Sequence, residues 1–323
     1  MTYTTDNGTI INGDVMKYIT TKDAKTKWNI SERRIRQLLE DGRIEGAIKI
    51  GNTWNIPENA NRPIDKRNIK SKKNDFIINL DEHYFDEVDD LKNKLDAKRP
   101  FSEVSLYSMR ESMNLEWIYN SNAIEGNTLT LKETKVVLEG ITVGGKTVKE
   151  HLEVINHENA ILFLEEILND DEPIIEWNIK QLHQLILKGI DDKNAGIYRR
   201  ENVLIKGAKH IPPDYLMIKE LMEKLVLNYT NWKEYHPIVK ATLLHGELVK
   251  IHPFIDRNGR TSRLIMNLVL MKYGYTPIII RKEEKLEYYE ALDKAHTTSD
   301  YTDFVKIVNR LEIEILKKYL NIL

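Results

Sequence analysis

The sequence predicts a mainly helical protein, and three observations support this fold class. The 323 residues are rich in helix-favouring Lys, Glu, Leu and Ile and contain only 15 Gly and 9 Pro. From residue 81 onward, apolar residues recur at helical spacing in one segment after another. A polar, basic stretch at 59–75 interrupts the apolar pattern, and a chain of this length holds about two domains. We therefore expect a first domain at 1–60, a linker at 61–78 and a second domain at 79–323.

The composition argues against several classes of protein. The absence of Cys rules out disulfides and thiolate metal sites and is typical of a cytosolic protein. The N-terminal residues do not read as a secretory signal, and the apolar stretches are far shorter than a membrane span. We expect a cytoplasmic protein without a membrane partner. A homodimer is possible.

The charge is unevenly distributed. Residues 1–73 carry 15 Lys and Arg against 9 Asp and Glu, a net charge of +6, while the whole chain has −2. The remainder therefore carries −8. This asymmetry favours a polyanionic partner for the N-terminal part, although a modest basic excess is also typical of a solvated surface.

Residues 18–56 are expected to form two short helices and a hairpin. Thr20 or Thr21 can cap the first helix and Ser31 the second, and alternating residues around 51–52 predict the hairpin. The segment resembles winged helix-turn-helix domains of the excisionase or MerR type, which bind DNA through the second helix.

Basic side chains lie at the positions that such a domain uses for phosphate contacts. They are Arg33, Arg34 and Arg36 on the second helix and Lys49 on the hairpin. DNA is therefore one candidate partner. A protein-docking or dimerisation module with a basic surface explains the same pattern, and both interpretations stay open.

The second domain is expected to be all helical except for one small β-hairpin. Residues 201–213 alternate around Gly207 and end at two prolines, which predicts the hairpin. The expected helices cover 81–98, 105–126, 131–140, 151–168, 177–189, 215–232, 236–251 and the apolar run that follows residue 263.

The segment HPFIDRNGRTSR, which starts at His252, places a base, an acid and several cations on one turn between two apolar helices. Helix amides near Gly259 can bind an anion, and Arg260 and Arg263 share a helical face that suits phosphate oxygens. Asp256 suits Mg²⁺, and His252 is a candidate general base. The set predicts nucleotide phosphate chemistry more strongly than a polar turn with ion pairs.

This segment resembles the signature of Fic-domain proteins, His-x-Phe-x-(Asp/Glu)-Gly-Asn-(Gly/Lys)-Arg-x-x-Arg, and the resemblance spans roughly residues 100–315. SNAIEGNTLTL at 121–131 matches the inhibitory motif (Ser/Thr)-x-x-x-Glu-(Gly/Asn), and 196–213 is similar to the flap of the family. Arg257 stands where most members have glycine. We expect its side chain to point outward; a phosphate contact or crowding of the nucleotide are the alternatives.

The resemblance implies an all-α Fic bundle with a hairpin flap and a protein adenylyltransferase activity. Such an enzyme transfers AMP from ATP to a Ser, Thr or Tyr hydroxyl of a target protein. His252 would be the base, and Asp256 would hold Mg²⁺. The nucleotide would contact Asn258, Gly259, Arg260 and Arg263, with Tyr288 and Tyr289 either lining the adenine side or serving as core aromatics.

Two further regions receive roles from the same resemblance. The inhibitory helix, 105–126, would carry Ser121, Glu125 and Gly126, with the glutamate paired to Arg263 in the space of the γ-phosphate. The flap would dock the target segment through Val203, Ile205, Gly207 and Ile211.

Other functions stay open beside this one. Some close relatives use the glutamate that corresponds to Glu125 to remove AMP from the target. Rare family members use UTP or CDP-choline as the donor. A DNA-binding regulator with a Fic domain impaired by Arg257 is a further alternative. A metal site at His236, His245 and His252 is disfavoured, because spacings of nine and seven lack the i, i+4 pair of helical zinc sites.

Overall fold

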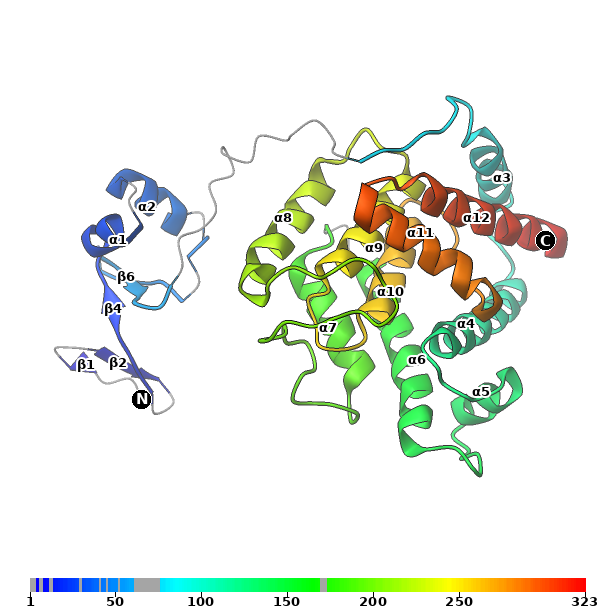
Figure 1. Ribbon diagram of the computed structural model, residues 1–323, viewed down its shortest axis with the longest axis horizontal. Coiled ribbons are helices and arrows are strands. Elements are labelled where there is room, and N and C mark those ends of the chain that lie inside the picture. The colour runs from blue at the N-terminus through cyan, green and yellow to red at the C-terminus, as the bar shows by residue number, and fades with distance from the viewer. Residues whose placement is uncertain are drawn as a thin grey trace. The chain divides into compact units, whose positions relative to one another are not determined.

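The computed structural model describes residues 4–5, 8–11, 14–28, 31–40, 42–44, 46–51, 53–60, 76–168 and 173–323. The chain separates into two compact units, Met1–Lys72 and Lys73–Leu323 (Figure 1). Most of the expected linker, 61–75, lies outside the described residues. At its end, Phe76 packs edge-on against Trp232 and Tyr301, so this residue belongs to the larger unit.

The smaller unit contains two short helices and two small sheets. Helices α1 (Thr21–Trp28) and α2 (Glu32–Glu40) accompany an antiparallel sheet with the order β4-β6-β5. Its strands are β4 (Tyr18–Ile19), β5 (Ile48–Ile50) and β6 (Thr53–Pro57), and a second sheet, not expected from the sequence, joins β1 (Thr4–Thr5), β2 (Gly8–Ile11) and β3 (Asp14–Met16).

Local sequence explains the helix boundaries of this unit. The Thr20 hydroxyl accepts from the N–H of Asp23, whose carboxylate accepts from the Thr20 N–H, so this pair caps α1. Gly42 follows α2 with a φ of 64°. Glycine is favoured at such a helix end because it adopts the left-handed backbone without strain. The apolar face of α2 packs with that of α1 around a small core of Ala24, Trp28, Ile35, Leu38, Leu39, Ile44 and Ile56.

The larger unit is a helical bundle, which confirms the expected fold class. Two short 3₁₀ turns, η1 (Tyr215–Met217) and η2 (Lys282–Glu284), precede α8 and α11. The helices are α3 (Asp86–Asp96), α4 (Glu103–Ile124), α5 (Leu131–Leu138), α6 (Val148–Leu168), α7 (Glu176–Leu187), α8 (Ile218–Asn231), α9 (Pro237–Ile251), α10 (Asn258–Lys272), α11 (Lys285–Thr298) and α12 (Thr302–Ile322).

Helices α9 and α10 form the centre of this unit. Nearly every side chain of both helices is buried, including the polar first turns of α10; the rest of α10 and most of α9 are apolar on all sides. Helix α10 packs against α9, α7, α6 and α4. The turn between α9 and α10 is therefore held on several sides, which gives its polar residues a rigid support.

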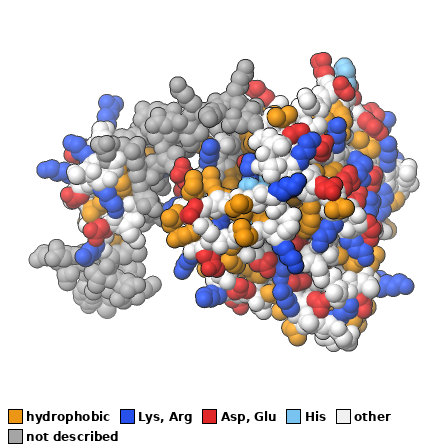
Figure 2. All heavy atoms as spheres, viewed as in Figure 1, with side chains coloured by type: hydrophobic (Ala, Val, Ile, Leu, Met, Phe, Trp, Pro, Cys, Tyr) orange, Lys and Arg blue, Asp and Glu red, His pale blue; other side chains and the backbone are white. Residues whose placement is uncertain are grey.

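The expected β-hairpin at 201–213 is wrong. These residues are all described, and they form an extended loop with a turn at Gly207 and no paired strands. Side chains hold the loop instead: the carboxylate of Asp293 on α11 accepts from the backbone N–H groups of Lys209 and His210. Leu204, Ile211 and Leu216 are strongly exposed here, and Figure 2 shows hydrophobic side chains on this face of the unit.

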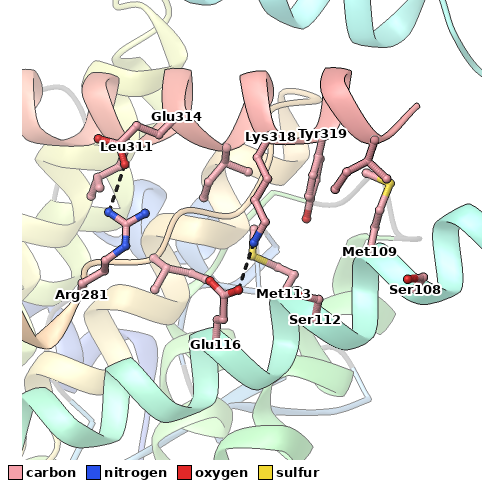
Figure 3. A pocket seen from close by; sticks show the side chains of 13 residues that line it. Ser108, Met109, Ser112, Met113, Glu116, Arg281, Leu311, Glu314, Lys318 and Tyr319 are labelled. Carbon is pink, nitrogen blue, oxygen red and sulfur yellow. Dashed lines mark hydrogen bonds and ion pairs between the residues drawn. The ribbon is translucent and has the colours of Figure 1, made fainter. Parts of the chain in front are cut away.

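Helices α4 and α12 enclose a cavity of about 170 Å³ that contains none of the signature residues. Its floor is apolar, with Met109 and Met113 on α4. Two ion pairs of 3.0 Å cross its rim, between Glu116 and Lys318 and between Arg281 and Glu314 (Figure 3).

Among the described residues, no helix is long and apolar enough to cross a membrane.

Candidate active site

The signature segment forms the turn between α9 and α10. His252 (φ 51°) and Arg257 (φ 62°) both have left-handed backbone, and they bracket the turn. Phe254 is buried and stacks on His183, with 3.7 Å between ring centroids. The Asn258 amide donates to the Phe254 carbonyl at 2.8 Å and accepts from its N–H at 3.0 Å. The side-chain nitrogen and oxygen of Asn258 therefore both hold the turn, and its expected contact with phosphate stays a prediction.

Glu125 lies directly over the N-terminus of α10. Its Oε1 accepts from Nη2 of Arg263 at 2.8 Å. The same guanidinium donates to Ser121, from Nε to the hydroxyl at 3.2 Å and from Nη2 to the carbonyl at 2.9 Å. A Cβ on Gly259 would lie 2.7 Å from Oε1 of Glu125, so glycine is needed for this close approach. The carboxylate thus occupies the position in which helix amides bind an anion.

The charges of this pair stabilise each other inside the protein. Burial raises the pKa of Glu125, but Arg263 and then Arg260 outweigh burial and leave this pKa below its ordinary value. Burial likewise opposes the charge of Arg263, but Glu125 raises the pKa of this guanidinium above its ordinary value. Both groups are therefore charged at neutral pH, as a buried ion pair requires.

Arg257 points inward, so the expectation of an outward side chain is wrong. Its side chain is 8% exposed, and its Nη2 lies 2.6 Å from Oε1 of Glu153 on α6. Its Nη1 lies 3.3 Å from Oδ2 of Asp256. A buried carboxylate needs a partner, and Glu153 provides the attraction that draws the guanidinium in.

The three arginines of the signature keep hydrogen-bond donors without a partner in the described part of the chain. These buried atoms are Nε of Arg257, Nε and Nη1 of Arg260, and Nη1 of Arg263. An unpaired buried N–H costs about 1–3 kcal/mol, so such a group calls for an acceptor. Several donors in one place fit an anion with several oxygens, such as a polyphosphate.

His252 is suited to accept a proton. Burial lowers the pKa of its imidazole to about 4, so the ring is neutral at neutral pH. Its Nδ1 lies 3.3 Å from the Val249 carbonyl. A proton on Nδ1 satisfies this carbonyl and leaves Nε2 free as the acceptor.

Asp256 carries the carboxylate of the turn that fits a metal ion. Its side chain is 58% exposed, with Oδ1 accepting from the Arg257 N–H at 2.7 Å. Within the described ranges, no group of three or more His, Cys, Asp or Glu could hold a metal ion. Mg²⁺ in nucleotide sites is commonly held by one or two carboxylates together with phosphates. A single carboxylate beside an anion site therefore fits Mg²⁺ bound with a nucleotide.

Comparison with known proteins identifies the family of this chain. Residues 173–270 match the Fic/DOC family. The structure is similar to that of a Fic-1 fragment from C. elegans, with a TM-score of 0.67, 31% identity, and coverage of 73% of this chain and 71% of that one. The chain belongs to the Fic/DOC family. A Fic-domain signalling protein from Bacteroides thetaiotaomicron has a TM-score of 0.68 at 29% identity, covering 73% of this chain and 96% of that one.

Curated relatives of this Fic protein carry an activity in their names. Protein adenylyltransferase Fic of Drosophila erecta is 35% identical over 250 residues, or 76% of this chain and 50% of the relative. The protein of the same name from Nematostella vectensis is 33% identical over 268 residues, covering 80% of this chain and 61% of the relative. The chain thus spans about half the length of the Drosophila relative.

The two tyrosines predicted at the adenine side of the Fic site differ in exposure. Tyr288 is buried, and its hydroxyl lies 2.9 Å from Nε2 of His245. Tyr289 is 38% exposed. Burial raises the pKa of both hydroxyl groups, to about 12 in the case of Tyr289. Tyr288 is a core aromatic in this structure, and Tyr289 is the one that a ligand can reach.

Arg199 connects the loop at 201–213, the expected flap, to His252. Its Nε donates to the carbonyl of His252 at 2.9 Å. The same side chain donates to the carbonyls of Glu201 at 2.8 Å and Pro213 at 2.5 Å, one at each end of the flap. The buried guanidinium therefore holds both ends together without strand pairing. Val203 and Ile205, two of the predicted docking residues, are half-buried between these ends.

Three residues of the site were missed in the sequence. Glu153 and Arg199 are buried charges, and His183 supports the turn by donating from Nε2 to the Asp256 carbonyl at 3.1 Å. For Glu153 a signal existed: it precedes Val154 and shares a helical face with His157 and Ala160, so an acid stands on a buried face. His183 likewise shares the buried face of α7 with Ile179 and Ile186, whereas Arg199 stands in a loop without such a contrast.

Proposed function

We propose that this Fic protein transfers AMP from ATP to a hydroxyl group of a target protein and that Glu125 inhibits the transfer. The observation that carries the proposal is the Glu125–Arg263 pair above Gly259. The unpartnered arginine donors beside this pair call for an anion. The names of the adenylyltransferase relatives support the same activity.

The transfer needs a base and an electrophile in line. Nε2 of His252 accepts the proton of the target hydroxyl. The hydroxyl oxygen bonds to the α-phosphorus while the bond between this phosphorus and the pyrophosphate oxygen breaks. The products are an AMP ester of the target and pyrophosphate, and the proton remains on His252.

The remaining chemistry is positioning and charge compensation. The Gly259 amide and the free Nε and Nη1 of Arg260 would bind phosphate oxygens, and Arg263 would bind the γ-phosphate once Glu125 leaves. Mg²⁺ bound at Asp256 would add charge compensation for the phosphates. Asp256 already contacts Arg257, so the metal would share this carboxylate with the guanidinium.

The flap is the proposed docking site for the target. Val203, Ile205, Gly207 and Ile211 would bind a segment that carries a Ser, Thr or Tyr hydroxyl. The loop is extended and lacks strand partners in this structure, which leaves its backbone available to an extended peptide.

The proposal is tested with ATP labelled at the α-phosphate. Glu125→Gly protein should label itself or a protein in a lysate, and Glu125→Gly/His252→Ala protein should not. Label that persists without His252, or no label from any form, contradicts the proposal. Competition by UTP and CDP-choline identifies the donor, and release of AMP from labelled protein by the wild type would reveal the reverse reaction.

For the smaller unit we propose binding to DNA. Arg33 and Arg36 are exposed on α2, and Lys49 is exposed on β5. Such a basic helix suits phosphate contacts in a winged helix-turn-helix arrangement. Binding of the full chain to duplex DNA should weaken with salt and weaken further in Arg33→Ala/Arg36→Ala protein. Equal binding by both proteins contradicts this role.

A further inference from the structure

Arg257 stands in a backbone conformation that favours glycine. Its φ of 62° is left-handed, a conformation that is unfavourable for an L-residue with a side chain. Glycine, which is usual at this place in the signature, does not carry this cost. The arginine side chain is nevertheless folded in and nearly buried. Its contacts therefore show what this chain gains from the substitution.

The contacts centre on the carboxylate of Glu153. Its Oε1 pairs with Nη2 of Arg257 at 2.6 Å. Its Oε2 accepts from the Asn127 amide at 2.9 Å and from Nη2 of Arg260 at 3.3 Å. Glu153 thus divides its two oxygens between the two arginines, and Arg257 has the shorter contact.

This division leaves Arg260 with a single, long ion-pair contact. Its side chain is 1% exposed, yet its Nε and Nη1 have no partner among the described residues. A guanidinium next to a free carboxylate normally forms two parallel bonds. Without Arg257, both oxygens of Glu153 are available to Arg260, and a two-bond pair would consume donors that are now free.

Arg257 is itself a poor phosphate ligand in this arrangement. Its Nη2 is held by Glu153 and its Nη1 by Asp256, so Nε is its only nitrogen without a partner among the described residues. Burial and the neighbouring Arg257 also lower the pKa of Arg260, which is expected for two cations in contact with one carboxylate. The extra arginine therefore acts on Arg260 through Glu153.

We infer that Arg257 is a positioning residue that neutralises Glu153 and so keeps the free donors of Arg260 available to the phosphates of the nucleotide. This inference rests on the proposed function, because it takes ATP as the ligand of Arg260. It predicts that the usual glycine weakens this particular site, although glycine suits the backbone better.

The test is ATP binding measured by calorimetry in the Glu125→Gly background, in which the γ-phosphate position is open. Arg257→Gly should raise the Kd about tenfold, as expected for one lost charge-assisted contact. Adding Glu153→Gln should restore the Kd to within about threefold, because a neutral amide competes far less for Arg260. Lys193→Gly, which removes an exposed loop lysine, is the charge control and should leave the Kd unchanged.

The rescue separates positioning from a merely structural role. If Arg257 only fastens the turn, Glu153→Gln removes a further contact and the double variant binds ATP more weakly than Arg257→Gly alone. That result overturns the inference, and so does an unchanged Kd for Arg257→Gly. Circular dichroism of each variant identifies any variant that has lost its fold, and Arg257→Asn, which tolerates the left-handed backbone, then replaces Arg257→Gly.

Failure of the inference is distinguishable from failure of the proposed function. If the Glu125→Gly protein binds ATP but labels no protein, the transfer is refuted while the ratio of Kd values still tests the role of Arg257. If it binds ATP and transfers AMP but Arg257→Gly leaves the Kd unchanged, only the inference is overturned. Absence of ATP binding overturns both.

Discussion

Glu125 and Arg263 form an ion pair of 2.8 Å between the residue that follows α4 and the second turn of α10. The two residues are 138 positions apart in the chain, and the contact exists because α4 packs against α10. This pair joins the motif at 121–126 to the signature and is the contact that the nucleotide has to replace in the proposed reaction.

Removal of the carboxylate should therefore activate the protein. Glu125→Gly frees Nη2 of Arg263, and a charge-assisted hydrogen bond of about 1.5–3 kcal/mol corresponds to roughly a 10- to 100-fold effect. We expect at least a tenfold rise in labelling from ATP with label at the α-phosphate. Glu139→Gly, at the exposed end of α5, is the matched control and should behave as the wild type. Equal labelling by Glu125→Gly and wild-type protein would refute inhibition by this residue.

Ser121 should contribute a smaller part of the inhibition. Its hydroxyl accepts from Nε of Arg263 at 3.2 Å, while its carbonyl contact is independent of the side chain. Ser121→Ala removes one hydrogen bond of about 1 kcal/mol, which predicts an activation of roughly fivefold. Activation as large as that of Glu125→Gly would show that the hydroxyl, and not the carboxylate, controls Arg263.

The pH dependence of the transfer should follow the low pKa of His252. Burial lowers this pKa to about 4, so the imidazole stays neutral and able to accept a proton down to this range. In Glu125→Gly protein the rate should stay level from about pH 8 to about pH 5 and fall as the pH approaches 4. Circular dichroism at each pH excludes unfolding as the cause. A midpoint near the ordinary pKa of histidine would show that the base is more exposed than this structure indicates.

Stability should fall at alkaline pH because of Glu312 on α12. Burial raises the pKa of this carboxyl to about 8, and its Oε1 accepts from the N–H and hydroxyl of Thr276 at 2.8 and 2.7 Å. A folded pKa above the unfolded value contributes stability that is complete below the unfolded pKa and is lost as the pH rises through about 8. The melting temperature should be several degrees lower near pH 9 than near pH 6 in the wild type. Glu312→Gln protein has no ionisable group at this position, so the difference between its melting temperatures at the two pH values should be smaller. If the difference is as large as in the wild type, other groups cause it.

The flap should depend on Arg199. Arg199→Met removes the donors to the carbonyls of Glu201, Pro213 and His252. Hydrogen exchange of the flap should become faster, and labelling of the target should fall about tenfold or more, since small misplacements of a substrate are costly. The Kd of ATP should change little. Arg200→Met, at the exposed neighbouring position, is the matched control. Unchanged exchange in Arg199→Met protein would contradict a clamp at this residue.

The sequence was sufficient for the helices up to α10 and for the turn that carries the signature, whereas α11 and α12 were not among the expected helices. The apolar periodicity reports which face of a helix is buried, so α9, α10 and the turn between them could be predicted. The periodicity does not report which distant residue lies opposite. Glu153 is 104 positions away from Arg257, and without this partner the inward side chain could not be foreseen.

The flap shows a second limit of sequence patterns. Alternation around Gly207 is typical of a hairpin, but strand pairing is only one way to satisfy a backbone. Here the buried Arg199 donates to carbonyls of the loop, and the carboxylate of Asp293 accepts from one of its N–H groups. These side chains hold the loop in place of strand pairing. Asn258 shows a related limit, because an amide that completes a local turn is indistinguishable in sequence from one that contacts a ligand.

Helix α4 bears Glu125 at its end but is also a structural part of the core. Trp117 and Ile118 on this helix are buried, and each such side chain contributes about 1.5–3 kcal/mol when removed from water. Departure of the whole helix would expose these side chains and the apolar floor of the cavity shared with α12. Rotation of one glutamate breaks a single ion pair. Release of the inhibition is thus expected to be a local rotamer change, fast and reversible, that leaves the bundle intact.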